Sequence, residues 1–276
     1  ERECSIQRRY QKIIEETPSP FINKKIRKKL EKTAIDISKS CNYSGAGTIE
    51  FLIDKYQNYY FLEMNTRLQV EHPITEMVNN LDLVQLQILI ASGERLPFVQ
   101  SDIQPTGHSI ECRIYAEDGL NNFTPSTGII ENVFLPQGLG IRFDEGFLPN
   151  QEITPYYDPL LGKLISWGKD RTIALSRMNR ALKEFQINGI ETNIEFCKLI
   201  INHRLFKKGI YCTDTLEKIK DDLEKKISKH QINLLTPAAI GMVTEYLNSN
   251  KYIKPKSENK SKESNWKSIG KRNNLR

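Results

Sequence analysis

The sequence has no long apolar run, no paired cysteines and no glycine-rich nucleotide fingerprint. No stretch approaches the roughly 18 apolar residues that a membrane-spanning helix needs, so we expect no membrane partner. The five cysteines are odd in number and none lies in a C-x-x-C pair, which argues against a disulfide framework or a zinc site. Neither a Rossmann nor a P-loop glycine motif occurs. The cysteine usage favours a reducing compartment, and we expect the cytoplasm.

The length and composition predict a globular protein. With 276 residues and 38% hydrophobic content, the chain can bury a substantial core in one large or two modest domains. It begins at Glu1 and has no apolar leader of the kind that a secretory signal requires. We therefore expect a piece of a longer protein.

The positive charge lies in the last 26 residues. Residues 251–276 carry nine Lys or Arg and two Glu. Their net charge of +7 exceeds the net charge of +6 of the whole chain. This segment is poor in apolar residues and rich in Ser and Asn, so we predict a disordered, solvated tail. The alternative, nucleic-acid binding through the tail, lacks an attached binding fold, and we expect no nucleic-acid partner.

Hydrophobic periodicity and turn residues predict an α+β protein. An amphipathic helix is expected from Asn23 to Ser40, followed by a hairpin of strands Thr48 to Asp54 and Tyr59 to Met64 and a helix from Leu81 to Ala91. Further strands are expected at Ser109 to Tyr115, Ile129 to Phe134 and Leu164 to Trp167, and helices after Asp170 and near 193–205, 213–228 and 236–248.

The segment from Glu63 to Glu71, EMNTRLQVE, has a polar or charged residue at every odd position. In an extended chain, this alternation aims two carboxylates, a guanidinium and two amides at one surface. A water-facing strand could carry the same mixture, but it would not need this order of acid, amide, cation, amide and acid. The row therefore indicates a functional surface.

The residue types in this row suit phosphoryl transfer to a small acid. Glu50 and Glu63 lie on adjacent predicted strands and, with Asn65, form an oxygen cluster suited to Mg²⁺ or Mn²⁺. Arg67 offers a planar fork for a small oxyanion. Glu71 could act as a base. The alternative for the two acids is a cross-strand pair that merely faces solvent.

Six sequence blocks resemble the biotin carboxylases of the ATP-grasp superfamily. They are EMNTRLQVEHP (63–73), CSIQRRYQK (4–12), GAGTIEF (45–51), GHSIECRIYAED (107–118), FTPSTG (123–128) and PYYDPLLGKLI (155–165). The resemblance implies the C-terminal part of an ATP-grasp domain over residues 1–100 and a biotin carboxylase C-terminal domain, with an antiparallel sheet plus helices, over 101–230. A helical extension over 231–250 and the tail over 251–276 complete this predicted organisation.

The resemblance also implies roles for individual residues. The metals that bridge the ATP phosphates would be held by Glu50, Glu63 and Asn65. Bicarbonate would be bound by Arg67, Gln69 and Val70, and Glu71 would be the base that deprotonates it before it attacks the γ-phosphate to give carboxyphosphate.

The remaining implied roles concern biotin and the nucleotide. Arg113 would stabilise the enolate of biotin. Gln7 and Lys12 would line the phosphate and bicarbonate end of the site. Tyr10 stands at a nucleotide-facing position where many family members carry His, and Arg142 matches a position near the family's dimer contact and biotin pocket.

Without the resemblance, simpler interpretations remain for several of these residues. Arg113 could be an exposed strand charge, and Gln7 and Lys12 could lie on a basic surface strand. His72 would pack or cap locally. The cysteines in the motif blocks, Cys4 and Cys112, are expected to be packing residues without an activated thiolate.

The implied activity needs partners. No Met is followed by Lys, so biotin would arrive on a separate carrier protein or domain, and a carboxyltransferase would use the product. The family resemblance also implies a homodimer through the C-terminal domain. It places the family's N-terminal domain and ATP-covering lid before Glu1, so the alternative hypothesis is a catalytically incomplete fragment that acts as a dimerising interaction module.

Overall fold

The structure is a computed structural model that describes residues 1–251, apart from the side chains of 229–235, 238 and 248–251 in the last helix. A first compact unit comprises Glu1–Leu223, and a second unit starts at Glu224. The predicted basic tail lies outside the described residues from 252 onward.

A five-stranded antiparallel sheet forms the centre of the first unit. Its strand order is β1 (Glu3–Arg8), β2 (Gln11–Thr17), β5 (His108–Tyr115), β12 (Leu160–Gly168) and β10 (Ile141–Glu145). The N-terminal hairpin therefore pairs with strands that come after residue 100. The domain boundaries proposed from the sequence remain a prediction, and the sheet joins segments on both sides of residue 100.

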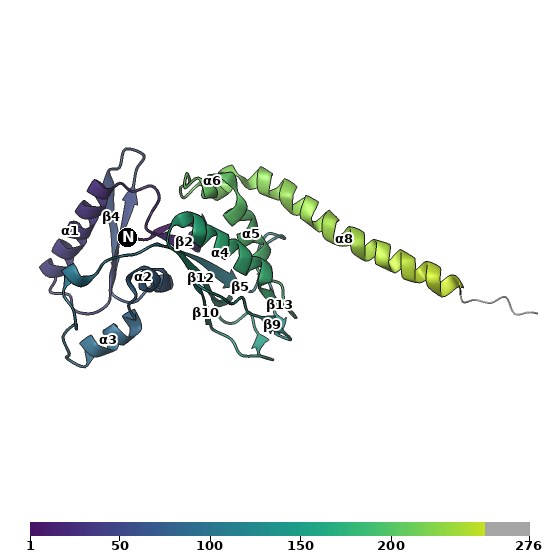
Figure 1. The fold of residues 1–276 in the computed structure, drawn as a ribbon, viewed down its shortest axis with the longest axis horizontal. Coiled ribbons are helices and arrows are strands. Elements are labelled where there is room, and N and C mark those ends of the chain that lie inside the picture. Colours follow the sequence, from purple (N-terminus) through teal and green to yellow (C-terminus); the bar gives the residue numbers. More distant parts are fainter. Residues whose placement is uncertain (252–276) are drawn as a thin grey trace, which may run out of the picture. The chain divides into compact units, whose positions relative to one another are not determined.

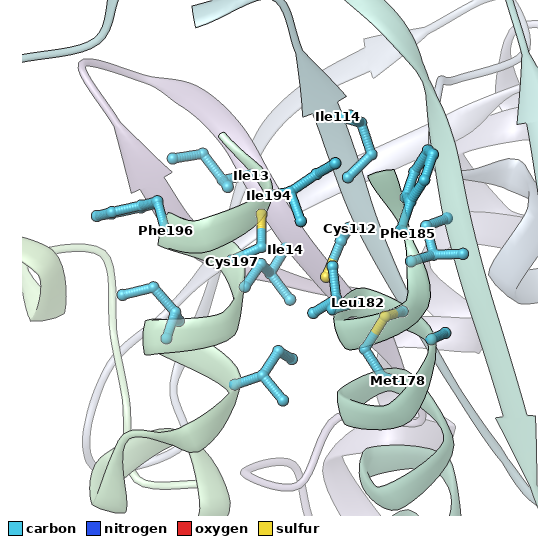
Figure 2. Packing of buried hydrophobic residues seen from close by; sticks show 14 of the residues in the cluster. Ile13, Ile14, Cys112, Ile114, Met178, Leu182, Phe185, Ile194, Phe196 and Cys197 are labelled. Atoms are coloured by element: carbon cyan, nitrogen blue, oxygen red, sulfur yellow. The ribbon is translucent and has the colours of Figure 1, made fainter. Parts of the chain in front are cut away.

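The two faces of this sheet differ in chemistry. On one face, apolar residues of β2 and β5 pack against α4 (Arg171–Glu184) and α5 (Ile194–Asn202), as Figure 2 shows. The labelled core residues are Ile13, Ile14, Cys112, Ile114, Met178, Leu182, Phe185, Ile194, Phe196 and Cys197. Because side chains alternate along a strand, Glu111 and Arg113 of β5 lie on the opposite face. Every residue of β5 is buried, so that face places charges in the interior.

A second layer of the first unit contains α1 (Lys24–Ser40) and the hairpin of β3 (Thr48–Ile53) and β4 (Tyr59–Asn65) (Figure 1). Asn23 caps α1 by accepting hydrogen bonds from the backbone N–H groups of Lys25 and Ile26. A cavity of about 710 Å³ is lined by residues of α1, of the hairpin and of the loop between them, among them Ser38, Met64 and Tyr43 respectively. The predicted helix and hairpin are both present.

The extended row predicted from Glu63 to Glu71 is wrong beyond Asn65, where β4 ends. The chain bends at Thr66 and Arg67, and a helix, α2 (His72–Asn79), begins directly after Glu71. Pro73 lies in the first turn of α2, where its missing N–H costs no hydrogen bond and its fixed φ suits a helix. The strand alternation therefore does not place Arg67, Gln69 and Glu71 on one extended face.

Several of the remaining elements were not predicted from the sequence, and one predicted strand is divided differently. The strand expected at 129–134 is two short strands, β8 (Gly128–Ile129) and β9 (Val133–Phe134), because each pairs with a different partner. The other elements of the first unit are α3 (Leu83–Ala91), η1 (Gln100–Asp102), β6 (Glu117–Asp118), β7 (Thr124–Pro125), β11 (Glu152–Ile153), β13 (Gln186–Ile187), α6 (Arg204–Lys207) and α7 (Thr215–Lys218).

The last helix, α8 (Lys220–Lys251), joins what the sequence predicted as two helices. Pro237 lies inside it. Within the described part of the chain, no helix combines the length and apolar character that crossing a bilayer would require. The predicted α+β class is confirmed.

Candidate active site

Lys12 on β2 connects the sheet to the β3–β4 hairpin. Its Nζ donates to Glu71 Oε1 at 2.8 Å and lies 3.2 Å from Glu50 Oε1. Glu71 precedes α2, and Glu50 lies on β3, so one ammonium group meets carboxylates from two other elements. The structure thus brings together three residues that the sequence separated by up to 59 positions.

Glu71 is also bound by Arg113 from β5. The Nη2 atom of Arg113 donates to Glu71 Oε2 at 2.9 Å, and its Nε donates to Glu15 Oε1 at 2.6 Å. The Glu71 side chain is 2% exposed and that of Glu15 is fully buried. Arg113 is itself buried, so the interpretation of Arg113 as an exposed strand charge is wrong.

The charges around Glu71 keep it ionised. Burial alone would raise its pKa, but the hydrogen bond from Lys12 and the charges of Lys12, Arg2 and Arg113 outweigh burial and lower the pKa to about 2. Burial likewise opposes the charge of Lys12, yet its neighbours, among them Glu71 and Glu50, raise its pKa. Glu71 and Lys12 are therefore held in their charged forms.

The predicted oxygen cluster is present on the hairpin. Glu50 and Glu63 are direct cross-strand partners. Asn65 Nδ2 bridges them, at 3.2 Å from Glu50 Oε1 and 2.9 Å from Glu63 Oε1. Two carboxylates and an amide that converge on one strand pair are a donor set that fits Mg²⁺ or Mn²⁺.

The segment between the hairpin and α2 lies against this cluster. Gln69 is buried, and its Nε2 donates to Glu50 Oε1, while its Oε1 accepts from Arg2. The carbonyl oxygen of Val70 accepts a 3.2 Å hydrogen bond from Lys163 Nζ. Gln69 therefore contacts the hairpin through Glu50, and Val70 contacts β12 through Lys163.

Among the described residues, the other predicted ones make no hydrogen bond to Lys12, Glu71 or Arg113, although Gln7 is the cross-strand partner of Lys12. Arg67 is exposed, and its Nη1 donates to the neighbouring Leu68 carbonyl. Gln7 Nε2 donates to the Cys4 carbonyl, and Tyr10 is 96% exposed in the turn between β1 and β2. Arg142 binds Glu76 on α2 and Asp144 on β10.

Three residues at the site were missed from the sequence: Arg2, Glu15 and Lys163. Arg2 contacts Gln69, Thr48 and Thr75 through its guanidinium. Glu15 follows the apolar pair Ile13 and Ile14, but its burial depends on the pairing of β2 with the distant strand β5. No short-range pattern marks Arg2 or Lys163, because Thr48 and Val70, their respective partners at the site, lie 46 and 93 residues away.

The minor predictions at the site are confirmed. His72 interacts through Nδ1 with the Gln69 carbonyl at 2.9 Å, which is a local contact. Cys112 lies in the core. Cys4 approaches Glu71 Oε1 with its thiol at 3.7 Å, and burial raises its pKa well above the ordinary value, so no activated thiolate arises. All five cysteines are unpaired.

Two protein families match adjoining parts of the chain. Residues 1–99 match the ATP-binding domain of the carbamoyl-phosphate synthase L chain, and residues 111–218 match the biotin carboxylase C-terminal domain. The first match contains the hairpin, Lys12 and Glu71. The second contains Arg113 and Lys163.

Curated relatives and solved structures agree with these matches. A biotin carboxylase of Halalkalibacterium halodurans is 50% identical over 209 residues, covering 76% of this chain and 46% of the relative. A pyruvate carboxylase subunit from Methanothermobacter thermautotrophicus is 47% identical over 231 residues, covering 83% of this chain and 46% of the relative. The biotin carboxylase domain of the Hydrogenobacter thermophilus 2-oxoglutarate carboxylase superposes with a TM-score of 0.77 at 45% identity, covering 79% of this chain and 48% of that one.

The chain corresponds in sequence and fold to part of a biotin carboxylase. It spans about half the length of the curated relatives that it matches. It combines an ATP-binding family segment with the biotin carboxylase C-terminal domain in one α+β fold.

Proposed function

We propose that this chain contributes to the ATP-dependent carboxylation of carrier-bound biotin with bicarbonate through carboxyphosphate, the first half-reaction of a biotin-dependent carboxylase. The observation that carries the proposal is the joint contact of Lys12 and Arg113 with Glu71, at 2.8 and 2.9 Å. Two cations and one carboxylate on rigid elements form a binding site for a small anion that carries a proton.

The residues of the hairpin suit the cofactor of this reaction. The related Hydrogenobacter domain was solved with magnesium ADP and bicarbonate. In this chain, Glu50, Glu63 and Asn65 would hold Mg²⁺ or Mn²⁺ with ATP, with Gln7, Tyr10 and Lys12 on the nucleotide and phosphate side. The metal, when bound, neutralises the charge that develops on the transferred phosphoryl group.

Bicarbonate binding would change the ionisation of Glu71. The donors Lys12 and Arg113 hold the pKa of Glu71 far below the pH at which a general base works best. An anion that accepts hydrogen bonds from these two donors, with Arg67, Gln69 and Val70 around it, weakens their hold on Glu71. The pKa of Glu71 then rises toward the working range of a base that takes the bicarbonate proton.

Arg113 has a second role in the proposal. Its guanidinium is fixed between Glu15 and Glu71, and its pKa is raised because, although burial opposes its charge, the charges of Glu15 and other neighbours outweigh burial. A fixed, permanently charged donor is suited to stabilise the enolate oxygen of biotin. For this role, the guanidinium of Arg113 must stay in the same position before and after bicarbonate is deprotonated.

The proposal includes partners. Biotin would arrive on a carrier protein or domain, and a carboxyltransferase would transfer the carboxyl group onward. Homodimer formation is supported by the dimer named for the related Hydrogenobacter domain, and we place its contact in the C-terminal domain.

A chimera tests the function. Residues 1–218 of this chain would replace the matching part of the 50%-identical biotin carboxylase, and carboxylation of free biotin would be followed with labelled bicarbonate and ATP. We expect ATP hydrolysis that depends on both bicarbonate and biotin, and its loss in the Arg113→Ala and Glu71→Ala versions. A folded, nucleotide-binding chimera without either dependence would refute catalysis and leave the interaction module as the function of these residues.

A further inference from the structure

Two buried carboxyl groups face each other behind Arg113. Glu15 on β2 and Glu111 on β5 are direct cross-strand partners, and both are fully buried. Side chains in such positions have Cβ atoms about 5 Å apart and point to the same face of the sheet. Among the described residues, no hydrogen-bond donor reaches either oxygen of Glu111 or Oε2 of Glu15.

The neighbouring cations are engaged with other groups. Arg113 binds Glu15 Oε1 and Glu71, while Lys12 binds Glu71 and Glu50. On β12, Lys163 binds the Val70 carbonyl and Asp144 of β10. Further charged or titratable groups near this face are Cys4 of β1, Tyr115 of β5, Arg142 of β10, and His72 and Glu76 of α2. Within the part of the chain that the structure describes, no cation is therefore left to pair with Glu111.

A second ionised carboxylate at this position would be an unpaired buried charge. The cost of burying such a charge is several kcal/mol or more, and a proton removes it. Carboxyl groups that share a site lose their first and second protons at well-separated pH values. Burial and the neighbouring Glu15 accordingly raise the pKa of Glu111 well above its ordinary value.

We propose that Glu15 and Glu111 share one proton, and that neutral Glu111 is a positioning residue whose O–H donates to Glu15 Oε2. The hydrogen bond satisfies an otherwise unpartnered oxygen on each residue. It also fixes the Glu15 carboxylate, whose other oxygen holds Arg113 Nε. Arg113 Nη2 is thereby kept directed at Glu71, and this catalytic consequence rests on the proposed function.

Infrared spectroscopy of the full 276-residue chain tests the shared proton without any substrate. The carbonyl band of a protonated carboxylic acid is distinct from carboxylate bands, and ¹³C-labelled glutamate assigns it to Glu side chains. At about pH 8, where ordinary Glu side chains are ionised, the folded chain should retain this band. The band should be lost in Glu111→Gln and kept in the exposed control Glu31→Gln. A folded wild-type chain without the band would overturn the proposal.

A pair of variants tests the positioning role. Glu111→Gln keeps an N–H donor for Glu15, whereas Glu111→Met is similar in size and has none. A carboxyl group with a raised pKa stabilises the fold most at low pH and loses that contribution as the pH rises through its folded-state value. The denaturation midpoint of Glu111→Gln should therefore fall less than that of the wild type between about pH 6 and 8, and Glu111→Met should be less stable than Glu111→Gln throughout.

The outcomes separate this proposal from the proposed function. Equal stability and equal pH dependence in both variants would show that the donor is not needed, whatever the activity of the chimera. If neither variant folds, the infrared band of the protonated carboxylic acid in the wild-type chain decides whether the proton is shared. An inactive chimera together with a persistent band would refute the function and leave the shared proton standing.

Discussion

Arg113 and Glu71 are joined by a hydrogen bond of 2.9 Å between Nη2 and Oε2, although 42 residues separate them in the sequence. The bond links the central sheet to the start of α2. Because both side chains are buried, it acts in a region where charges interact strongly. The bond therefore couples the stability of the fold to the arrangement of the proposed anion site.

Replacing Glu71 by Gln should destabilise the chain by about 3 kcal/mol at neutral pH, the equivalent of a pKa lowered from its usual value to about 2. A carboxyl group with a lowered folded-state pKa stabilises the fold above its unfolded-state pKa and loses that contribution as the pH falls. The difference between wild type and Glu71→Gln should thus shrink below about pH 4.5 and vanish near pH 2.

Urea denaturation at several pH values checks this expectation. Glu31→Gln, on the exposed side of α1, is the matched control and should leave the midpoint unchanged. A Glu71→Gln chain as stable as the wild type at neutral pH would show that the ion pairs of Glu71 contribute nothing net.

Arg113→Met should cost about 3–5 kcal/mol of stability, because it leaves the buried carboxylates of Glu15 and Glu71 without their shared cation. The matched control is Arg180→Met on α4, where the ion pair with Glu184 is nearly half exposed and should contribute less than about 1 kcal/mol. Arg113→Lys keeps the charge but cannot reach both carboxylates with a planar fork. Thermal and urea unfolding of the three variants would contradict the expectation if Arg113→Met and Arg180→Met behaved alike.

The sequence predicted the local elements of this fold better than its long-range pairings. The helix after Asn23, the Glu50–Glu63 strand pair and the helix after Asp170 follow from neighbouring residues, and all three are present. The pairing of β2 with β5 joins residues about a hundred positions apart. No local pattern encodes that register, which is why the burial of Glu15 and its contact with Arg113 could not be predicted.

The oxygen cluster of Glu50, Glu63 and Asn65 could be predicted because it depends only on neighbouring residues. Glu50, Glu63 and Asn65 lie on one hairpin, so alternation and strand register suffice to bring them together. Glu71 and Arg67 lie past the end of β4, where alternation no longer applies. Glu71 lies at the start of α2, where it reaches Lys12 and Arg113, whereas Arg67 is exposed.

Manganese binding tests the oxygen cluster directly on the chain. Glu50→Gln and Glu63→Gln should each weaken Mn²⁺ binding by about tenfold or more, since each removes a charged oxygen ligand from a hard-cation site. Electron paramagnetic resonance of free Mn²⁺ gives the dissociation constants, and Glu31→Gln is again the control. Unchanged binding in both variants would remove the hairpin as the metal site.

Lys163→Met should raise the KM for bicarbonate more than it lowers kcat in the chimeric enzyme. Lys163 Nζ is bonded to the Val70 carbonyl at 3.2 Å and paired with Asp144 at 3.4 Å, so it fixes the peptide that leads into Glu71. Loss of one such hydrogen bond to a charged donor is worth about 1.5–3 kcal/mol, which corresponds to a tenfold or greater change in KM. The effect falls on binding because Lys163 holds the wall of the anion site, whereas Lys12, Arg113 and Glu71 contact the anion itself in the proposed function. Lys163→Arg, which keeps a donor and a charge, should recover most of the lost affinity. Steady-state kinetics with bicarbonate as the varied substrate measure both parameters, and a fall in kcat alone, with KM unchanged in Lys163→Met, would contradict this role.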